Sequence, residues 1–267
     1  MYRIVDKKIL NPQITAMTVE APFVAKKVQP GQFVIIRADE KGERVPLTVA
    51  DFDREKGTVT VILQAIGFST KKISSFNVGE SLADCVGPLG VPTEFGSPKK
   101  AIVIGGGVGC AIAYPQAKAL HNMGVDTTVI AGFRSKDIVI LEEEMKAVSN
   151  NLYITTDDGS YGHKGFVTDV LKDLISKDTY DLVIAIGPIP MMKFVSKTTE
   201  EQNIKTIVSL NPIMIDGTGM CGGCRVNVGG EVKFACVDGP DFDGHKVDFD
   251  ELMRRNSFYR GEEAHVC

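Results

Sequence analysis

Three cysteines near the C-terminus have the spacing of ligands to an iron–sulfur cluster. The segment from Asp216 to Cys236 reads DGTGMCGGCRVNVGGEVKFAC and places Cys221 and Cys224 as a C-x-x-C pair in a glycine-rich loop. Plant-type clusters use C-x4-C-x2-C and one distant cysteine, and here Asp216 stands at the first of those positions. A carboxylate oxygen can bind iron, although it is a harder ligand than a thiolate. The spacing predicts a 2Fe–2S cluster held by Asp216, Cys221, Cys224 and Cys236.

Two simpler interpretations of these cysteines stay open, a structural zinc site and a C-x-x-C without function. Zinc sites usually combine two close ligand pairs, and this sequence has one. A disulfide is disfavoured, because the N-terminal segment MYRIVDKKIL is not a signal peptide. Cys85 and Cys110 lie on apolar stretches and are expected to be buried thiols, whereas Cys267 is expected to be a free thiol.

The composition is that of an ordinary globular protein with more than one domain. The chain has 267 residues, of which 43% are hydrophobic and 24% charged, and its formal net charge is −4. This length predicts two domains, or two with an appendage. The negative charge argues against nucleic acid as a partner, and no apolar run is long enough to span a bilayer. Six cysteines without an export signal indicate a reducing cytoplasm.

Residues 1–98 have the pattern of a small antiparallel β-barrel. Glycine-containing turns separate short runs that are typical of strands. The expected strands are Tyr2–Leu10, Ile14–Glu20, Phe33–Ala38, Val45–Phe52, Thr58–Ala65 and Ser81–Val86. One helix is expected at Lys71–Phe76, with Ser69 or Thr70 near its N-terminus, where backbone N–H groups can bind a phosphate.

Three stretches of this barrel are candidates for ligand binding. They are Arg44-Val45-Pro46-Leu47-Thr48, with a cation and a hydroxyl beside an apolar strand, the strand edge Ile62-Leu63-Gln64, and the helix start Gly67-Phe68-Ser69-Thr70. Each also has a simple structural explanation. Arg44 could be a solvated charge at an edge, and the last stretch could be a capped helix without a ligand.

Residues 99–210 alternate strands with helices, which predicts a doubly wound parallel sheet with helices on both faces. The expected strands are Lys99–Ile104, Thr127–Ala131, Leu152–Thr156, Leu182–Ile186 and Thr206–Leu210, and the expected helices are Cys110–Met123, Asp137–Val148, Phe166–Ile175 and Met191–Gln202. In such sheets ligands bind at the carboxyl ends of the strands.

Three loops are expected at those carboxyl ends. They are Gly105-Gly106-Gly107-Val108-Gly109, Asp157-Asp158-Gly159 and Gly187-Pro188-Ile189-Pro190-Met191-Met192. The first can approach a pyrophosphate closely because glycine has no Cβ, but it is not the G-x-G-x-x-G of a Rossmann FAD site. The aspartates would repel a 2′-phosphate and favour NAD(H) over NADP(H), which Arg134 and Lys136 could oppose. Met191 and Met192 are equally explained by core packing.

The remaining residues, 211–267, are expected to form a cluster-binding segment and a tail. A short hairpin is expected between Cys224 and Cys236, and a helix at Phe249–Phe258. Residues 237–267 are charged and offer few core candidates, so we expect them to cover the cluster or to face a partner, and we expect a chain truncated after Asp241 to retain FAD binding.

The order of these motifs resembles the ferredoxin–NADP reductase superfamily. Its most specific features are Asp216-Gly-Thr-Gly-Met-Cys221-Gly-Gly-Cys224, Thr156-Asp-Asp-Gly-Ser-Tyr-Gly-His-Lys-Gly165 and Gly187-Pro188. The chain is similar to electron-transfer subunits of dihydroorotate dehydrogenases, and more so to the small-subunit family of NADH-dependent reduced ferredoxin:NADP oxidoreductases and sulfide dehydrogenases. The resemblance implies that the first cluster ligand of the dihydroorotate type is cysteine, so Asp216 favours the second family.

The resemblance also implies the cofactors and the partner. FAD is assigned to Arg44, Pro46, Leu47, Thr48, Ile62, Leu63, Gln64, Gly67, Ser69 and Thr70, and the pyridine nucleotide to Gly105–Gly109, Arg134, Asp157–Gly159, Gly187, Pro188 and Met191. Electrons would pass between NAD(H), FAD and the cluster to a larger flavin and iron–sulfur subunit, and through it to ferredoxin, with no acid, base or nucleophile from this chain. A dihydroorotate dehydrogenase subunit and a zinc-stabilised nucleotide-binding regulatory protein without turnover are the alternatives.

Overall fold

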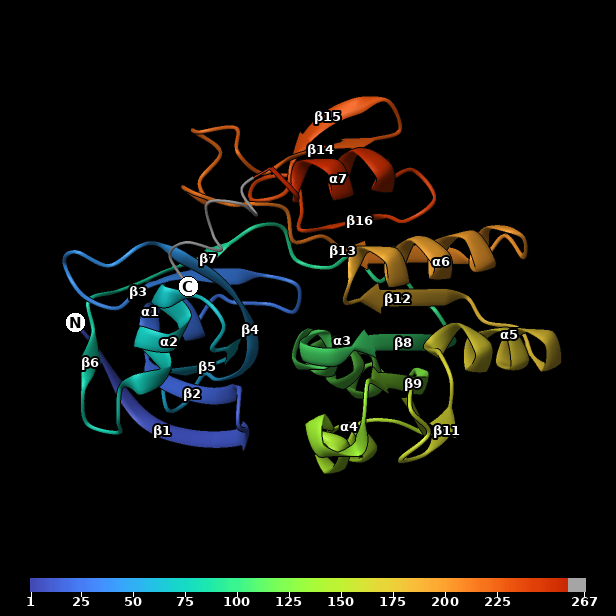
Figure 1. The fold of residues 1–267 in the computed structure, drawn as a ribbon, viewed down its shortest axis with the longest axis horizontal. Helices are drawn as coiled ribbons and strands as arrows, with labels where there is room; N and C mark the ends of the chain where they lie inside the picture. The colour runs from blue at the N-terminus through green and yellow to red at the C-terminus, as the bar shows by residue number, and fades with distance from the viewer. Residues whose placement is uncertain (259–267) are drawn as a thin grey trace.

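The computed structural model describes residues 1–258. An antiparallel β domain and a parallel α/β domain lie side by side, and a C-terminal segment lies across both (Figure 1). Cys267 and its expected free thiol fall outside the described residues. No helix among the described residues has the length and apolar character needed to cross a membrane.

The N-terminal domain is a seven-stranded antiparallel sheet that curls into a barrel. Its strands are β1 (Tyr2–Asn11), β2 (Ile14–Glu20), β3 (Phe33–Arg37), β4 (Val45–Asp53), β5 (Thr58–Gln64), β6 (Ser81–Leu82) and β7 (Asp84–Leu89), in the order β6-β1-β2-β5-β4-β3-β7. The two outer strands, β6 and β7, are consecutive in the chain and separated only by Ala83. One stretch of backbone therefore pairs with both ends of the sheet and closes the barrel.

Two short helices belong to this domain. Helix α1 (Pro22–Ala25) was not expected from the sequence, and it begins with the proline that suits a first helical turn. Helix α2 (Phe68–Ser75) begins three residues earlier than predicted, with Gly67 as its N-cap. Ser69 and Thr70 therefore lie within its first turn, where the backbone N–H groups have no partner inside the helix.

The second domain is a mostly parallel sheet with helices on both faces, as the sequence predicts. Strands β8 (Lys100–Gly106), β9 (Asp126–Phe133), β10 (Asn151–Thr156), β11 (His163–Lys164), β12 (Leu182–Ile186), β13 (Lys205–Ser209) and β16 (Asp241–Asp243) are arranged as β11-β10-β9-β8-β12-β13-β16. The helical segments are η1 (Gly107–Gly109), α3 (Cys110–Asn122), η2 (Lys136–Ile138), α4 (Glu142–Ala147), α5 (Val167–Lys177) and α6 (Ile189–Glu200).

Alternation of side chains along β8 explains the two layers of helices. Ala101 and Val103 pack against α3 and α4 on one face, whereas Ile102 and Ile104 pack against α5 and α6 on the other. A strand that is covered on both faces is apolar along its whole length. Ile14 of the barrel also joins the α3 side of the core, which fixes the barrel against this domain.

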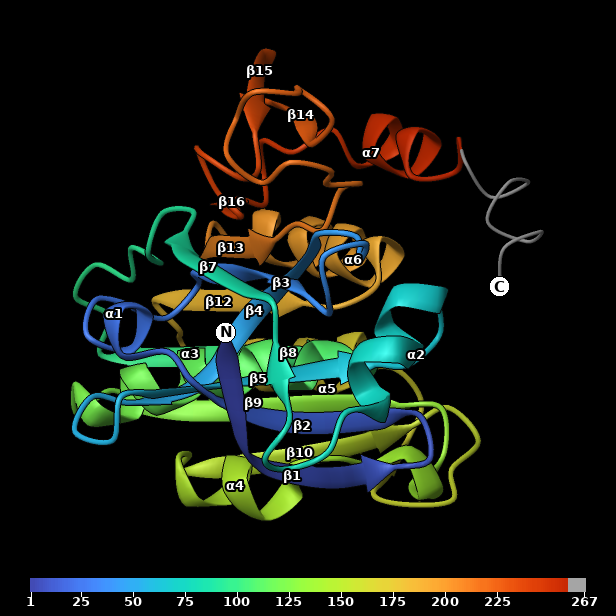
Figure 2. The ribbon, with the colours of Figure 1, turned by 90° about the vertical axis from the view of Figure 1, so that its left-hand side faces the viewer.

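The C-terminal segment is more structural than the sequence suggests. It contains the hairpin β14 (Arg225–Val228) and β15 (Glu231–Phe234), then β16, then helix α7 (Phe249–Arg255). Strand β16 pairs antiparallel with β13, and Phe249 and Leu252 are buried in the core of the α/β domain. The expectation of a tail with few core residues is therefore wrong for this stretch. Figure 2 shows the hairpin and α7 together at one end of the molecule.

Candidate functional site

The cluster loop, residues 216–224, and Cys236 bring the predicted iron ligands to one side of the barrel. Cys224 and Cys236 are buried with their Sγ atoms 3.2 Å apart, whereas Cys221 lies on the exposed part of the loop. The two buried cysteines pack against Phe33 and Ile35 of β3. The buried cysteines therefore pack on the barrel, with Phe242 from the edge of the α/β sheet in the same cluster.

Backbone N–H groups of the loop are directed at the cysteine sulfurs. Gly223 N donates to Cys221 Sγ over 3.4 Å, and this bond, with a second from the Asp216 N–H, lowers the pKa of the Cys221 thiol. Burial and the adjacent Cys224 thiol raise the pKa of Cys236 to about 12. The Gly219 N–H acts in the opposite direction and lowers this pKa. Paired thiols that are shielded from water and N–H groups directed at sulfur are features of thiolate-bound clusters. The residue types therefore suit such a cluster, but among residues 1–258 no three of these side chains are gathered closely enough to hold a metal ion, and only Cys224 and Cys236 are adjacent.

The carboxylate of Asp216 organises the same loop. Its Oδ2 accepts hydrogen bonds from Thr218 N at 3.0 Å, Thr218 Oγ1 at 2.6 Å and Met220 N at 3.2 Å. The Thr218 hydroxyl and the N–H groups hold the pKa of Asp216 below its usual range. No hydrogen bond within residues 1–258 uses Oδ1. One oxygen can therefore cap the loop while the other is available as a ligand.

Helix α7 supports the cluster loop, a contact that the sequence did not reveal. Arg255 Nη2 donates to Gly223 O over 3.3 Å, and Asn256 Oδ1 accepts from Ile213 N over 3.4 Å. Asn256 Nδ2 also donates to Asn211 O. The sequence carries no local signal for these contacts, because a polar residue at the end of a helix has many possible partners. One hydrogen bond, from Arg255, thus joins the C-terminal segment to the cluster loop, and the expectation that this segment covers the cluster or faces a partner stays a prediction.

The barrel opens between β4 and β5 at the residues predicted to hold FAD. Strand β5 pairs with β4 from Thr58 to Val61, but Ile62–Gln64 pair only with β2. On the opposite side of this opening, residues 45–48 of β4 pair only with β3. Two strand edges with backbone groups free on one side thus face each other, and the first turn of α2 follows directly after β5.

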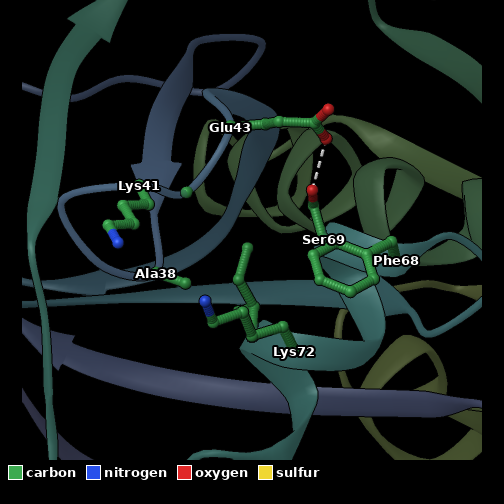
Figure 3. A pocket seen from close by; sticks show the side chains of 8 residues that line it. Ala38, Lys41, Glu43, Phe68, Ser69 and Lys72 are labelled. Carbon is green, nitrogen blue, oxygen red and sulfur yellow. Dashed lines mark hydrogen bonds between the residues drawn. The ribbon is translucent and has the colours of Figure 1, made fainter.

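A small pocket lies beside the first turn of α2 (Figure 3). Its volume is about 160 Å³, and its lining residues are Ala38, Lys41, Gly42, Glu43, Phe68, Ser69, Lys72 and Ile73. The Ser69 hydroxyl donates to the Glu43 carboxylate, and Lys72 forms an ion pair with Asp39. Arg44, the residue after Glu43, makes no hydrogen bond to Ser69 within residues 1–258. Its guanidinium donates to Asp216 O in the cluster loop.

The predicted nucleotide crevice lies where the strand order of the parallel sheet reverses, between β8 and β12. This is the position at which doubly wound sheets bind ligands. The structure brings the loops Gly105–Gly109 and Gly187–Met191 together here. A Cβ on Gly109 would lie 2.4 Å from Ile186 O, and one on Gly106 would lie 2.6 Å from Met191 Sδ. Gly105, Gly106 and Gly109 thus permit close packing of the chain on itself, whereas a Cβ on Gly107, at φ +56°, would have no neighbour within 4 Å among the described residues.

The acidic loop lies on the next strands of the same edge. Asp158 N donates to Arg134 O over 3.2 Å, which places the backbone of Arg134 beside the predicted aspartates. Asp158 Oδ1 accepts from Ser160 N and Ser160 Oγ, and these bonds, the hydroxyl first, lower the pKa of Asp158. Gly159 follows at φ +75° and completes the turn. The turn therefore places two carboxylates at the carboxyl ends of β9 and β10, with the Lys164 side chain packed beside Gly159.

Two family models match the chain in the regions just described. Residues 103–197 match the oxidoreductase NAD-binding domain, and residues 211–248 match the iron–sulfur cluster binding domain of dihydroorotate dehydrogenase B. A ferredoxin reductase of carbazole 1,9a-dioxygenase shares the fold, with a TM-score of 0.63 at 20% identity over 76% of this chain and 64% of that one. The fold and the family matches define an oxidoreductase subunit that combines an NAD-binding domain and an iron–sulfur cluster binding domain on the fold of ferredoxin reductases.

Closer relatives narrow that class. The dihydroorotate dehydrogenase B electron transfer subunit homolog of Thermotoga maritima is 46% identical over 98% of this chain and 93% of its own length. A structure of NADH-dependent reduced ferredoxin-NADP oxidoreductase, reported for flavin-based electron bifurcation, superposes with a TM-score of 0.94 at 45% identity, covering 100% of this chain and 96% of that one. The chain belongs to the family of dihydroorotate dehydrogenase B electron transfer subunits and their homologs. The expected superfamily is confirmed.

Proposed function

We propose that this chain is the electron-transfer subunit of a NADH-dependent ferredoxin:NADP oxidoreductase. It takes a hydride from NADH to FAD and delivers single electrons through a 2Fe–2S cluster to a larger subunit in the cytoplasm. The observation that carries this proposal is the seating of the cluster cysteines on β3 of the flavin-type barrel. The cluster thereby adjoins the barrel, while the nucleotide crevice lies on the neighbouring domain.

The proposed division of labour follows the three regions of the chain. Residues 1–98 bind FAD, residues 99–210 bind NAD(H), and residues 211–267 bind the cluster. The open edges of β4 and β5 offer backbone groups to a planar ring, and the first turn of α2 offers N–H groups to phosphate oxygens. FAD, when bound, supplies the exchange between two-electron and one-electron transfer. The chain's own residues bind the groups and orient them.

The proposed cluster ligands are Asp216, Cys221, Cys224 and Cys236. The hydrogen bonds to Asp216 Oδ2 leave Oδ1 for iron, so loop capping and ligation are compatible roles of one carboxylate. Asp216→Ala should make the cluster labile, and Asp216→Cys should retain a cluster with altered visible and paramagnetic-resonance spectra. Unchanged iron content, spectra and potential in Asp216→Ala would show that the aspartate is not a ligand.

Flavin reduction by the two nicotinamide nucleotides tests the functional proposal. Purified protein should contain one non-covalent FAD, and stopped-flow mixing should show faster bleaching with NADH than with NADPH. The reason is repulsion between a 2′-phosphate and the Asp157–Asp158 loop. Asp157→Asn should reduce the ratio of the bleaching rate with NADH to the rate with NADPH. A clear preference for NADPH would remove the specificity proposal, and protein without flavin would remove the whole proposal.

A dihydroorotate dehydrogenase subunit is the second candidate, and the family match of residues 211–248 favours it. The two candidates differ in the larger partner. Copurification from the native source, followed by assay of the complex with dihydroorotate and with reduced ferredoxin plus NADP⁺, separates them.

A further inference from the structure

Arg44 of the barrel forms a hydrogen-bonded contact with the cluster loop. Its Nε and Nη2 atoms both donate to Asp216 O, over 3.4 and 3.1 Å. The two residues are 172 positions apart in the sequence. Two N–H groups of one planar guanidinium on a single carbonyl fix the orientation of both partners. Arg44 therefore holds the residue that we assign as the first iron ligand by its backbone.

This contact extends a packed interface and is not an isolated surface bond. A Cβ on Gly217 would lie 2.8 Å from Ile35 Cδ1, and Gly217 has φ +81°. The loop thus approaches β3 as closely as a glycine permits. Cys224 and Cys236 pack against Phe33 on the same strand. Since β3 pairs with β4 at residues 45–48, Arg44 lies at the end of the strand beside this interface.

The Nη1 end of the Arg44 guanidinium has no hydrogen-bond partner among the described residues. A guanidinium carries five N–H donors, and within residues 1–258 the Nη1 atom makes no hydrogen bond. Arg44 also begins the Arg44–Thr48 stretch, which we assign to FAD. One cation can therefore serve the flavin region and the cluster loop at the same time. This step rests on the proposed function, because it requires FAD in the barrel.

We propose that Arg44 is a positioning residue that couples the flavin site to the cluster. It holds Asp216 in place and keeps a positive charge beside the cluster, which favours the reduced state because reduction adds one negative charge. It also transmits FAD occupancy to the cluster, since a change at Nη1 displaces the same rigid group that bonds Asp216 O.

Substitutions of Arg44 and of a matched arginine test the proposal in the full chain bound to its larger subunit. Arg54 lies just beyond the other end of β4 and donates to Val28 O over 3.1 Å, so R54Q removes a cation and a carbonyl contact away from the cluster loop. We expect R44Q to lower the cluster midpoint potential and to shift its paramagnetic-resonance spectrum, and R44K to restore part of the potential. R54Q should match the wild type. FAD affinity should fall about tenfold in R44Q, the equivalent of one charge-assisted hydrogen bond.

The outcomes separate this inference from the proposed function. R44Q protein that retains iron and shows the wild-type potential and spectrum overturns the inference alone, whereas wild-type protein without FAD or iron overturns the proposed function. If R44Q assembles no cluster, removal of FAD from the wild type and from R44K tests the coupling. FAD removal should shift the spectrum of the reduced cluster in the wild type. The shift should be at least about twofold smaller in R44K, because a single ammonium cannot replace the forked donors of the guanidinium. Equal shifts in both proteins overturn the coupling.

Discussion

The predicted nucleotide crevice and the cluster loop are built from different kinds of structure. The crevice is formed by strand ends and glycines that pack directly on buried backbone, as Gly109 does on Ile186 O. The cluster loop has an exposed surface, with Met220 88% exposed, and hydrogen bonds to Asp216 and to cysteine sulfur define its shape. The comparison indicates that the crevice is preformed, whereas the loop gains much of its stability from its ligand.

Removal of one buried cluster ligand should have the largest effect and should be confined to the cluster loop. Cys224→Ala is expected to abolish the cluster and to make residues 216–224 sensitive to proteolysis, because metal binding contributes to the stability of such a site. NADH-dependent reduction of FAD should persist. Iron analysis, limited proteolysis and stopped-flow reduction measure the three effects. Wild-type protease resistance in the iron-free variant would contradict the difference between the two regions.

Truncation of a core side chain in α7 should destabilise both regions together. Leu252 is 1% exposed and packs in the core beneath β13, while the same helix supports the cluster loop through Arg255. Leu252→Ala is expected to cost about 2–5 kcal/mol of unfolding free energy. The exposed neighbour variant Arg254→Ala should change it by less than about 0.5 kcal/mol. Denaturant unfolding checks both values, and equal stability of the two variants would show that α7 is peripheral. For the same reason, truncation after Asp241 is expected to damage the α/β domain.

A methyl group at Gly109 should distort the predicted nucleotide crevice and leave the cluster loop unchanged. The new Cβ would meet backbone and not a flexible side chain, so Gly109→Ala is expected to cost about 1–3 kcal/mol and to weaken NADH binding. Gly107→Ala meets no neighbouring atom and pays only for its positive φ, about 1 kcal/mol. Thermal unfolding and NADH titration compare the variants. A smaller effect at position 109 than at 107 would refute the close-packing account of the crevice.

The smallest effect is expected at a buried carboxyl where the barrel, α3 and β16 meet. Asp241 accepts from Thr93 Oγ1 at 2.5 Å and from Gln116 Nε2 at 3.2 Å, and burial raises its pKa above the ordinary value of 3.8. The folded chain then binds more protons than the unfolded chain, so stability falls as the pH rises from 3.8 towards the folded pKa.

Asp241→Asn should remove this dependence and stabilise the protein by about 1 kcal/mol at neutral pH, since an amide can donate to Gln116 Oε1, which is buried without a partner. Unfolding measured from pH 4 to 8 tests the sign. A wild-type stability that is independent of pH, or an equal slope in the variant, would contradict it.

The sequence alone predicted most of the strands and helices and the residue types of the candidate loops, although it missed α1 and β16. Local patterns are sufficient for both. The uninterrupted apolar run Ala101-Ile102-Val103-Ile104 indicates a strand covered on two faces, and ligand residue types at a fixed spacing indicate a metal site. A parallel sheet places the carboxyl ends of all its strands on one edge. The glycine loops and the aspartates at strand ends could therefore be predicted to lie at that edge. Family models for an NAD-binding domain and an iron–sulfur cluster binding domain match residues 103–197 and 211–248.

Only the tertiary structure decided how those parts meet. Barrel closure by β6 and β7, the insertion of β16 beside β13 and the contact of Arg44 with Asp216 each join segments that are distant in the sequence. Strand β16 has three residues, too few for a periodic signal, and it is held by pairing with β13. Arg44 reads as a surface charge until the cluster loop packs on β3. Such contacts depend on the docking of whole domains, which no local pattern of residues encodes.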